Sequence, residues 1–167
     1  MFVDAAFANN ADLSSQIGYV IALTNEQQLD ESTINISANI IHWSSTKCKR
    51  VTRSVLASEL YAIVAGFDIA TTLQSTIKGI IQAKIPLILY TDSYSLYDCI
   101  IRLGTTAEKR LIIDIMGLRQ SYERREINEV RWINGNCNLV DAITKERCCQ
   151  ALKQLVDNNA IKLKINA

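Results

Sequence analysis

The chain has little histidine, proline and glycine, and neither sign of charge dominates. It contains 1 His, 1 Pro and 6 Gly in 167 residues, with 18 Lys plus Arg against 17 Asp plus Glu. A balance this even excludes a global basic field that would draw the chain onto nucleic acid or an anionic membrane. Any contact with nucleic acid must therefore come from local patches.

Long apolar runs and paired cysteine motifs are also missing. No run reaches about 18 consecutive apolar residues, and the first residues lack the basic start and long apolar run of a signal peptide. The 5 cysteines are odd in number and show no CxxC spacing, which favours reduced thiols over disulfides or a zinc site. We therefore expect an intracellular protein that contacts no membrane.

The apolar patterns predict one mixed α/β domain over residues 1–167. Apolar residues make up 49% of the chain and charged residues 21%, which is ordinary for a globular domain. Local patterns predict strands at 1–8, 17–24, 39–44, 87–91 and 129–134, and helices at 52–74, 93–103, 108–124 and 138–157. The tail after residue 158 indicates a weak strand or a frayed end. The predicted order is β-β-β-α-β-α-α-β-α.

Four carboxylates occupy unusual positions in this order. Asp4 interrupts an apolar strand, Glu59 faces the same side as the apolar stripe of a helix, and Asp92 ends a buried strand. Asp141 lies near the start of the last helix. Because buried like charges repel and lose hydration, a fold that brings four carboxylates together needs divalent cations. The joint pattern predicts a metal-dependent nuclease.

Each carboxylate also has an ordinary explanation when taken alone. Asp4 could lie at an exposed strand edge and Glu59 on the exposed side of its helix. Asp92 could serve only as the aspartate that precedes a helix. Asp141 could be the capping-box partner of Asn138, which would cap the last helix.

Four segments of the chain resemble a known family. They are V-D-A-A-F-A-N-N (3–10), H-W-S-S-T-K-C-K-R-V-T-R-S-V-L-A-S-E-L-Y-A (42–62), T-D-S-Y-S-L-Y-D (91–98) and E-V-R-W-I-N-G-N-C-N-L-V-D-A-I-T-K (129–145). Together they resemble the ribonuclease H domain of copia-type LTR retrotransposon polyproteins, over nearly the whole chain. The resemblance implies a ribonuclease H-like fold: a five-stranded mixed sheet, with three antiparallel strands first and two added parallel, flanked by helices.

The same resemblance implies an endonuclease that hydrolyses the RNA strand of RNA–DNA hybrids by two-metal-ion catalysis. Asp4, Glu59, Asp92 and Asp141 would bind two Mg²⁺ ions, for which Mn²⁺ could substitute. One ion would use Asp4 and Asp141 and position the attacking water. The other would use Asp4, Glu59 and Asp92 and stabilise the leaving 3′ oxygen.

The resemblance further implies partners and a cellular location. The partners would be the RNA–DNA hybrid and the reverse transcriptase portion of the same polyprotein. The chain would act in the cytoplasm, within a virus-like particle, or in the nucleus.

The chain departs from the wider fold family at two positions. Many cellular ribonucleases H carry Gly-His in the loop before the last helix, whereas here Gly135 is followed by Asn136. Tyr94 stands where the family usually has a basic residue. An alternative function is therefore a domesticated, weakly active or inactive module that acts by binding nucleic acid or protein. A third reading is a DNA-cleaving relative.

A basic stretch before the helix of Glu59 is the candidate substrate contact. Four cations lie close to a helix amino end, whose exposed N–H groups suit phosphate, although a solvated charge run is the alternative. A serine and an asparagine nearby could bind sugar 2′-hydroxyls. The predicted substrate contacts are Asn10, Lys47, Lys49, Arg50, Arg53 and Ser54. Trp43 and Trp132 are predicted to pack in the core because of their apolar neighbours.

Overall fold

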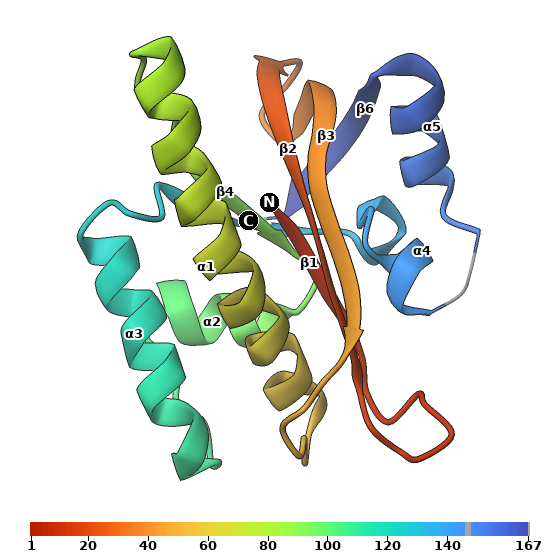
Figure 1. The fold of residues 1–167 in the computed structure, drawn as a ribbon, viewed down its shortest axis with the longest axis vertical. Coiled ribbons are helices and arrows are strands. Elements are labelled where there is room, and N and C mark those ends of the chain that lie inside the picture. The colour runs from red at the N-terminus through yellow and green to blue at the C-terminus, as the bar shows by residue number, and fades with distance from the viewer. Residues whose placement is uncertain (146–147, 167) are drawn as a thin grey trace.

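The computed structural model describes residues 1–145 and 148–166. Its helices and strands follow the predicted order up to β5, and two helices and a strand come after it (Figure 1). The strands are β1 (Phe2–Ala6), β2 (Gln16–Gln28), β3 (Thr33–Lys47), β4 (Ile88–Thr91), β5 (Glu129–Ile133) and β6 (Ala160–Asn166). The α-helices are α1 (Val55–Ile81), α2 (Tyr94–Ile101), α3 (Ile112–Glu123), α4 (Asp141–Thr144) and α5 (Gln150–Asn158). Short 3-10 turns, η1 (Lys109–Leu111) and η2 (Gly135–Cys137), precede α3 and α4.

The sheet is mixed, as the sequence predicts. β1, β2 and β3 pair antiparallel in sequence order, with Asp4 opposite Gly18. β4 then pairs parallel with β1, and β5 parallel with β4. The expected fold class, with three antiparallel strands followed by two parallel ones, is confirmed.

A sixth strand extends the predicted set of five. β6 pairs antiparallel with residues 33–37 of β3 and with the end of β5, so the strand order closes on itself as β1-β2-β3-β6-β5-β4. Ile161 and Leu163 are buried whereas Lys162 and Lys164 are exposed, which is the alternation of a strand with one covered face. The tail after residue 158 is thus a regular strand.

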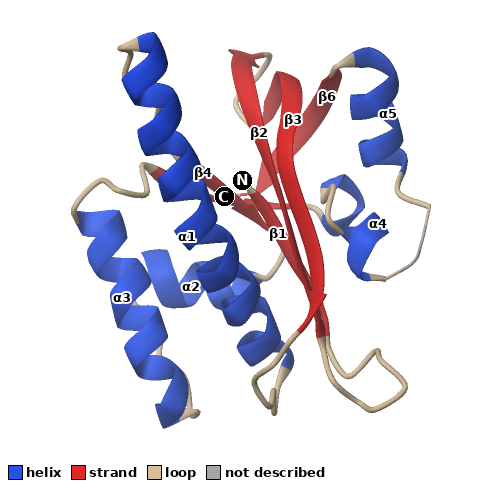
Figure 2. Cartoon of the chain, in the orientation of Figure 1, coloured by secondary structure: helices blue, strands red, loops and turns tan. Residues whose placement is uncertain are grey.

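Helices cover both faces of the sheet (Figure 2). α1, α2 and α3 lie on one side, and α4 and α5 on the other (Figure 1). The two apolar clusters follow the alternation along β1, since Val3 and Ala5 belong to one cluster and Phe2 to the other. Asp4 therefore lies within the sheet between two packed layers. By length and composition α1 is the one described helix that could cross a membrane, and half of its most apolar window is buried in the fold.

The longest predicted helix has the expected start and a later end. Ser54 caps α1, and its side chain accepts a hydrogen bond from the backbone N–H of Ala57 at 3.1 Å. α1 then continues to Ile81, past the predicted end at residue 74, and closes at Gln82 in the left-handed conformation with φ of 53°. Residues 55–81 contain no Pro that would end the helix before that point.

The single helix predicted over 138–157 is wrong. The structure has a short α4 and a separate α5, and residues 146–147 between them lie outside the described part of the chain. Cys149 is extended, with φ of −105° and ψ of 111°, so helical geometry does not run through it. Asn138 does not cap a helix either, because its side chain is used in contacts with the sheet.

Candidate active site

Three of the four predicted carboxylates converge. Asp4 on β1, Glu59 on α1 and Asp92 after β4 each offer an oxygen, and these oxygens lie within 4.8 Å of one another. Asp4 is 0% exposed and Glu59 5% exposed, which rules out the exposed-surface alternatives for both. The cap of α2 is Ser93, whose side chain accepts from the N–H of Leu96, so Asp92 is free of a capping role.

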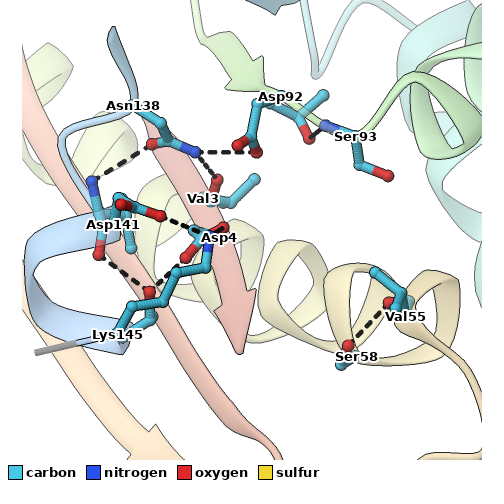
Figure 3. A network of polar contacts seen from close by, with 12 residues as sticks. Val3, Asp4, Val55, Ser58, Asp92, Ser93, Asn138, Asp141 and Lys145 are labelled. Atoms are coloured by element: carbon cyan, nitrogen blue, oxygen red, sulfur yellow. Dashed lines mark hydrogen bonds and ion pairs between the residues drawn. The ribbon is translucent and has the colours of Figure 1, made fainter. Parts of the chain in front are cut away.

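Neighbouring strands and one close backbone approach position these side chains. β1 and β4 are adjacent and parallel, so Asp4 and Asp92 project from the same region of the sheet (Figure 3). The η2 turn passes so close that a Cβ on Gly135 would lie 3.1 Å from Asp92 Oδ2. A side chain at position 135 would therefore push against the carboxylate.

The cluster carries unbalanced negative charge on its Glu59 side. Among the described residues, Glu59 Oε2 is the buried side-chain polar atom without a hydrogen-bond partner. Burial, followed by the charges of Asp4 and Asp92, raises the pKa of Glu59 well above its ordinary value. Burial and the charge of Asp4 also raise the pKa of Asp92, against a hydrogen bond from Asn138. The site therefore favours a bound proton or a cation.

Asn138 ties the last part of the chain to β1 and to the end of β4. Its Nδ2 donates to the Val3 carbonyl at 2.8 Å and to Asp92 Oδ1 at 3.1 Å, and its Oδ1 accepts from the Val140 N–H at 3.2 Å (Figure 3). It is fully buried. Sequence reasoning gave Asn138 a capping role and missed this one, although an Asn directly before the apolar pair Leu139 and Val140 was an available signal.

Asp141 joins the cluster through Lys145. The Lys145 Nζ donates to Asp4 Oδ1 at 3.1 Å and also to Asp141 Oδ1, as Figure 3 shows. The capping-box alternative for Asp141 is wrong, because its carboxylate pairs with Lys145 instead. The hydroxyl of Thr144 donates to Asp4 Oδ2. Sequence reasoning missed Lys145 and Thr144; the spacing of Asp141 and Lys145 by four residues was the one available signal.

An open cavity of about 440 Å³ leads to the cluster. Its lining includes Asp4, Glu59, Asp92 and Lys145, together with Phe7, Asn9, Val55 and Ser93. The burial of Lys145 opposes its charged form, but hydrogen bonding to Asp141 and the charge of Asp4 outweigh this and raise its pKa. The cavity is thus lined by carboxylates, with the one ammonium of Lys145 beside them.

The six predicted substrate residues lie outside this lining. Arg50 pairs with Asp114 at 3.1 Å and stacks over Tyr61, and Lys47 pairs with Asp12. The remaining predicted residues are used locally or are exposed: Ser54 caps α1 and contacts Glu108, Asn10 donates to Ser14 and Gln16, and Lys49 and Arg53 are exposed. Their role toward a substrate stays a prediction.

Two aromatic side chains flank the cluster. Trp132 Nε1 donates to the Asp92 carbonyl at 3.2 Å, and its ring meets Tyr94 edge-on at 4.9 Å between centroids. Arg102 donates to the Tyr94 hydroxyl at 3.1 Å. Trp132 itself is only partly buried. The prediction of a core role is wrong for Trp43, because that side chain on β3 is 65% exposed.

The donor set fits a divalent cation. It consists of carboxylate oxygens, which Mg²⁺ and Mn²⁺ prefer. The unpartnered Glu59 Oε2 points to a missing positive partner on this side of the cluster. Asp4, Glu59 and Asp92 would hold one ion, and Asp141 lies beyond Lys145 on the other side of Asp4.

The order of the elements and the mixed sheet are those of a ribonuclease H-like fold, and solved structures agree. The RNase H1 of the halophilic archaeon Halobacterium salinarum superposes with a TM-score of 0.56 at 15% identity, covering 91% of this chain and 95% of that one. The N-terminal RNase H domain of Rv2228c from Mycobacterium tuberculosis, solved as a fusion with maltose-binding protein, gives 0.56 at 12% identity, covering 93% and 94%.

A third similar structure was solved with nucleic acid. LC11-RNase H1 in complex with an RNA/DNA hybrid gives a TM-score of 0.51 at 14% identity, covering 80% of this chain and 99% of that one. No protein-family model matches the chain, and no curated protein is similar to it in sequence. The comparisons therefore establish the fold.

Proposed function

We propose that this chain is a divalent-metal-dependent ribonuclease H that cleaves the RNA strand of RNA–DNA hybrids. The observation that carries the proposal is the convergence of Asp4, Glu59 and Asp92 within 4.8 Å, with one buried oxygen of Glu59 left unpartnered. Buried carboxylates this close are costly without cations. The fold of RNase H1 proteins, one of them solved with a hybrid, supports the substrate class.

The four carboxylates share one role in this proposal. Asp4, Glu59, Asp92 and Asp141 would hold two Mg²⁺ ions, which supply an activated water and stabilise the leaving oxygen of an in-line displacement. Asn138 holds the Asp92 carboxylate against β1, and Thr144 holds that of Asp4. These two residues fix the oxygens that the reaction requires.

The origin and setting of the protein form a further part of the proposal. The sequence resemblance supports descent from the ribonuclease H domain of a copia-type polyprotein, with a reverse transcriptase as partner and an intracellular site of action. Single-domain organisation over residues 1–167 is part of the same proposal.

One observation favours a second candidate, a binding module with weak or no cleavage. The loop that approaches Asp92 at Gly135 carries Asn136, which cannot transfer a proton as histidine does. Such a module would keep hybrid affinity and lose turnover.

The two candidates are separated by a cleavage assay on end-labelled duplexes of one sequence. The purified chain is incubated with RNA–DNA hybrid, RNA duplex and DNA duplex, in Mg²⁺ and in EDTA. We expect Mg²⁺-dependent cutting of the hybrid alone, with 5′-phosphate and 3′-hydroxyl ends. Hybrid binding without cutting would favour the module, and cutting of the DNA duplex would contradict the substrate class.

A further inference from the structure

Lys145 lies in the position that a cation would take between two of the four carboxylates. Its Nζ donates to Asp4 Oδ1 at 3.1 Å and to Asp141 Oδ1, so one ammonium is shared by both groups (Figure 3). A divalent ion bound to the same two oxygens would need the same space and would repel the ammonium at short range. The two cations are therefore alternatives at this place.

The other half of the cluster differs in this respect. Among residues 1–145 and 148–166, neither Glu59 nor Asp92 forms an ion pair with a Lys or Arg side chain. Glu59 is almost fully buried, and its Oε2 lacks any hydrogen-bond partner. The cluster is thus asymmetric: the Asp4–Asp141 half already contains a cation, and the Asp4–Glu59–Asp92 half does not.

We propose that Lys145 is a built-in competitor for one of the two divalent ions. This inference rests on the proposed metal-dependent function and refines it. The first divalent ion would bind at Asp4, Glu59 and Asp92, and a second would bind between Asp4 and Asp141 only after the ammonium moves away.

The side chain of Lys145 suits such a movement. It is partly exposed and lines the open cavity, and its four-carbon stem can turn without displacing α4. A phosphodiester at the mouth of the cavity would give the ammonium a new anionic partner. The second ion would then bind together with the nucleic acid, so that the ion-loaded site forms only when the substrate is present.

Calorimetric titration with MgCl₂ in the absence of nucleic acid tests this directly. The proteins compared are the wild type, Lys145→Met, which keeps the length and removes the charge, and Lys145→Arg, which keeps the charge. We expect one Mg²⁺ ion per wild-type chain, and in Lys145→Met a second ion bound at least about tenfold more tightly than in the wild type. Lys145→Arg should behave as the wild type.

Equal stoichiometry and equal affinities in the wild type and Lys145→Met would overturn the inference. Two tight ions in the wild type would also overturn it while leaving the proposed function intact. No Mg²⁺ binding in any of the three proteins would overturn the metal-dependent function, and the inference with it.

A second measurement uses the wild type alone and needs no variant to fold. In ¹⁵N-lysine-labelled protein, a hydrogen-bonded Lys145 ammonium should give an exchange-protected NMR signal without Mg²⁺. Addition of Mg²⁺ alone should leave that signal, and addition of Mg²⁺ with a hybrid containing a non-cleavable linkage should remove it. A signal that persists in the ternary complex would contradict the release of Lys145.

Discussion

Replacing Glu59 by Gln should stabilise the metal-free protein at neutral pH. The Oε2 atom of Glu59 is buried without a partner, and its carboxyl faces Asp4 and Asp92. Glutamine has the same shape without the charge, and its amide can donate to a neighbouring carboxylate. An unsatisfied buried polar group costs about 1–3 kcal/mol. We therefore expect a gain of about 2 kcal/mol, or roughly 4–8 °C in melting temperature for a chain of this size.

The gain from Glu59→Gln should grow with pH. The pKa of Glu59 is raised in the folded state above its ordinary value of 4.5, so its protonated form contributes stability that is complete below that pH. This contribution is lost as the pH rises through the raised pKa. The variant has no carboxyl at this position, so its advantage over the wild type should be small at about pH 4.5 and larger at pH 7.

Mg²⁺ should reduce or reverse the difference in stability between Glu59→Gln and the wild type. A ligand at a hundredfold excess over its Kd stabilises a protein by about 2.7 kcal/mol, and Glu59→Gln removes one charged ligand. The assay is thermal unfolding in EDTA and in MgCl₂, with Glu123→Gln on the exposed side of α3 as the matched control. A variant less stable than the wild type in EDTA, or equally stabilised by Mg²⁺, would refute the reasoning.

Three further substitutions, with Gly79→Ala as a control for the first, test how the cluster is held. Gly18→Ala places a methyl group 2.7 Å from a side-chain atom of α4, so urea unfolding should show a free energy of unfolding lower by about 1–3 kcal/mol. A Cβ at Gly79 meets nothing within 4 Å, so Gly79→Ala should be neutral or slightly stabilising. Gly135→Ala should displace the Asp92 carboxylate and lower hybrid cleavage by about tenfold at nearly unchanged melting temperature; an unchanged rate would contradict the close approach seen here. Asn138→Ala removes a hydrogen bond that lowers the pKa of Asp92. NMR titration should therefore show that the Asp92 carboxyl has a higher pKa in the variant than in the wild type. An unchanged or lower pKa would count against the contact.

The sequence predicted those site residues whose charge is unusual for their place in a strand or helix. Asp4 stands in an apolar strand and Glu59 on an apolar helix face, and both anomalies are visible without knowledge of the fold. The structure buries both residues and brings them together with Asp92. Periodicity likewise predicted the order of elements from β1 to β5.

Contacts between distant segments could not be predicted in this way. Thr144 and Lys145 meet Asp4 across almost the whole chain, and Arg50 pairs with Asp114 only because α3 packs beside the start of α1. The sixth strand depends on the exposed edges of β3 and β5, which a sequence pattern does not show. The use of the Asn138 side chain by Val3 and Asp92, instead of as a helix cap, is likewise a contact between distant segments.

The most direct test of the account compares hybrid cleavage by the wild type, Asp92→Asn and Asp68→Asn in Mg²⁺. Asp92 belongs to the carboxylate cluster, and Asp68 is an exposed aspartate on α1 that serves as the matched control. The account predicts that cleavage is lost in Asp92→Asn, with its fold intact by circular dichroism, and kept in Asp68→Asn. Cleavage that persists in a folded Asp92→Asn variant would contradict the assignment of the active site.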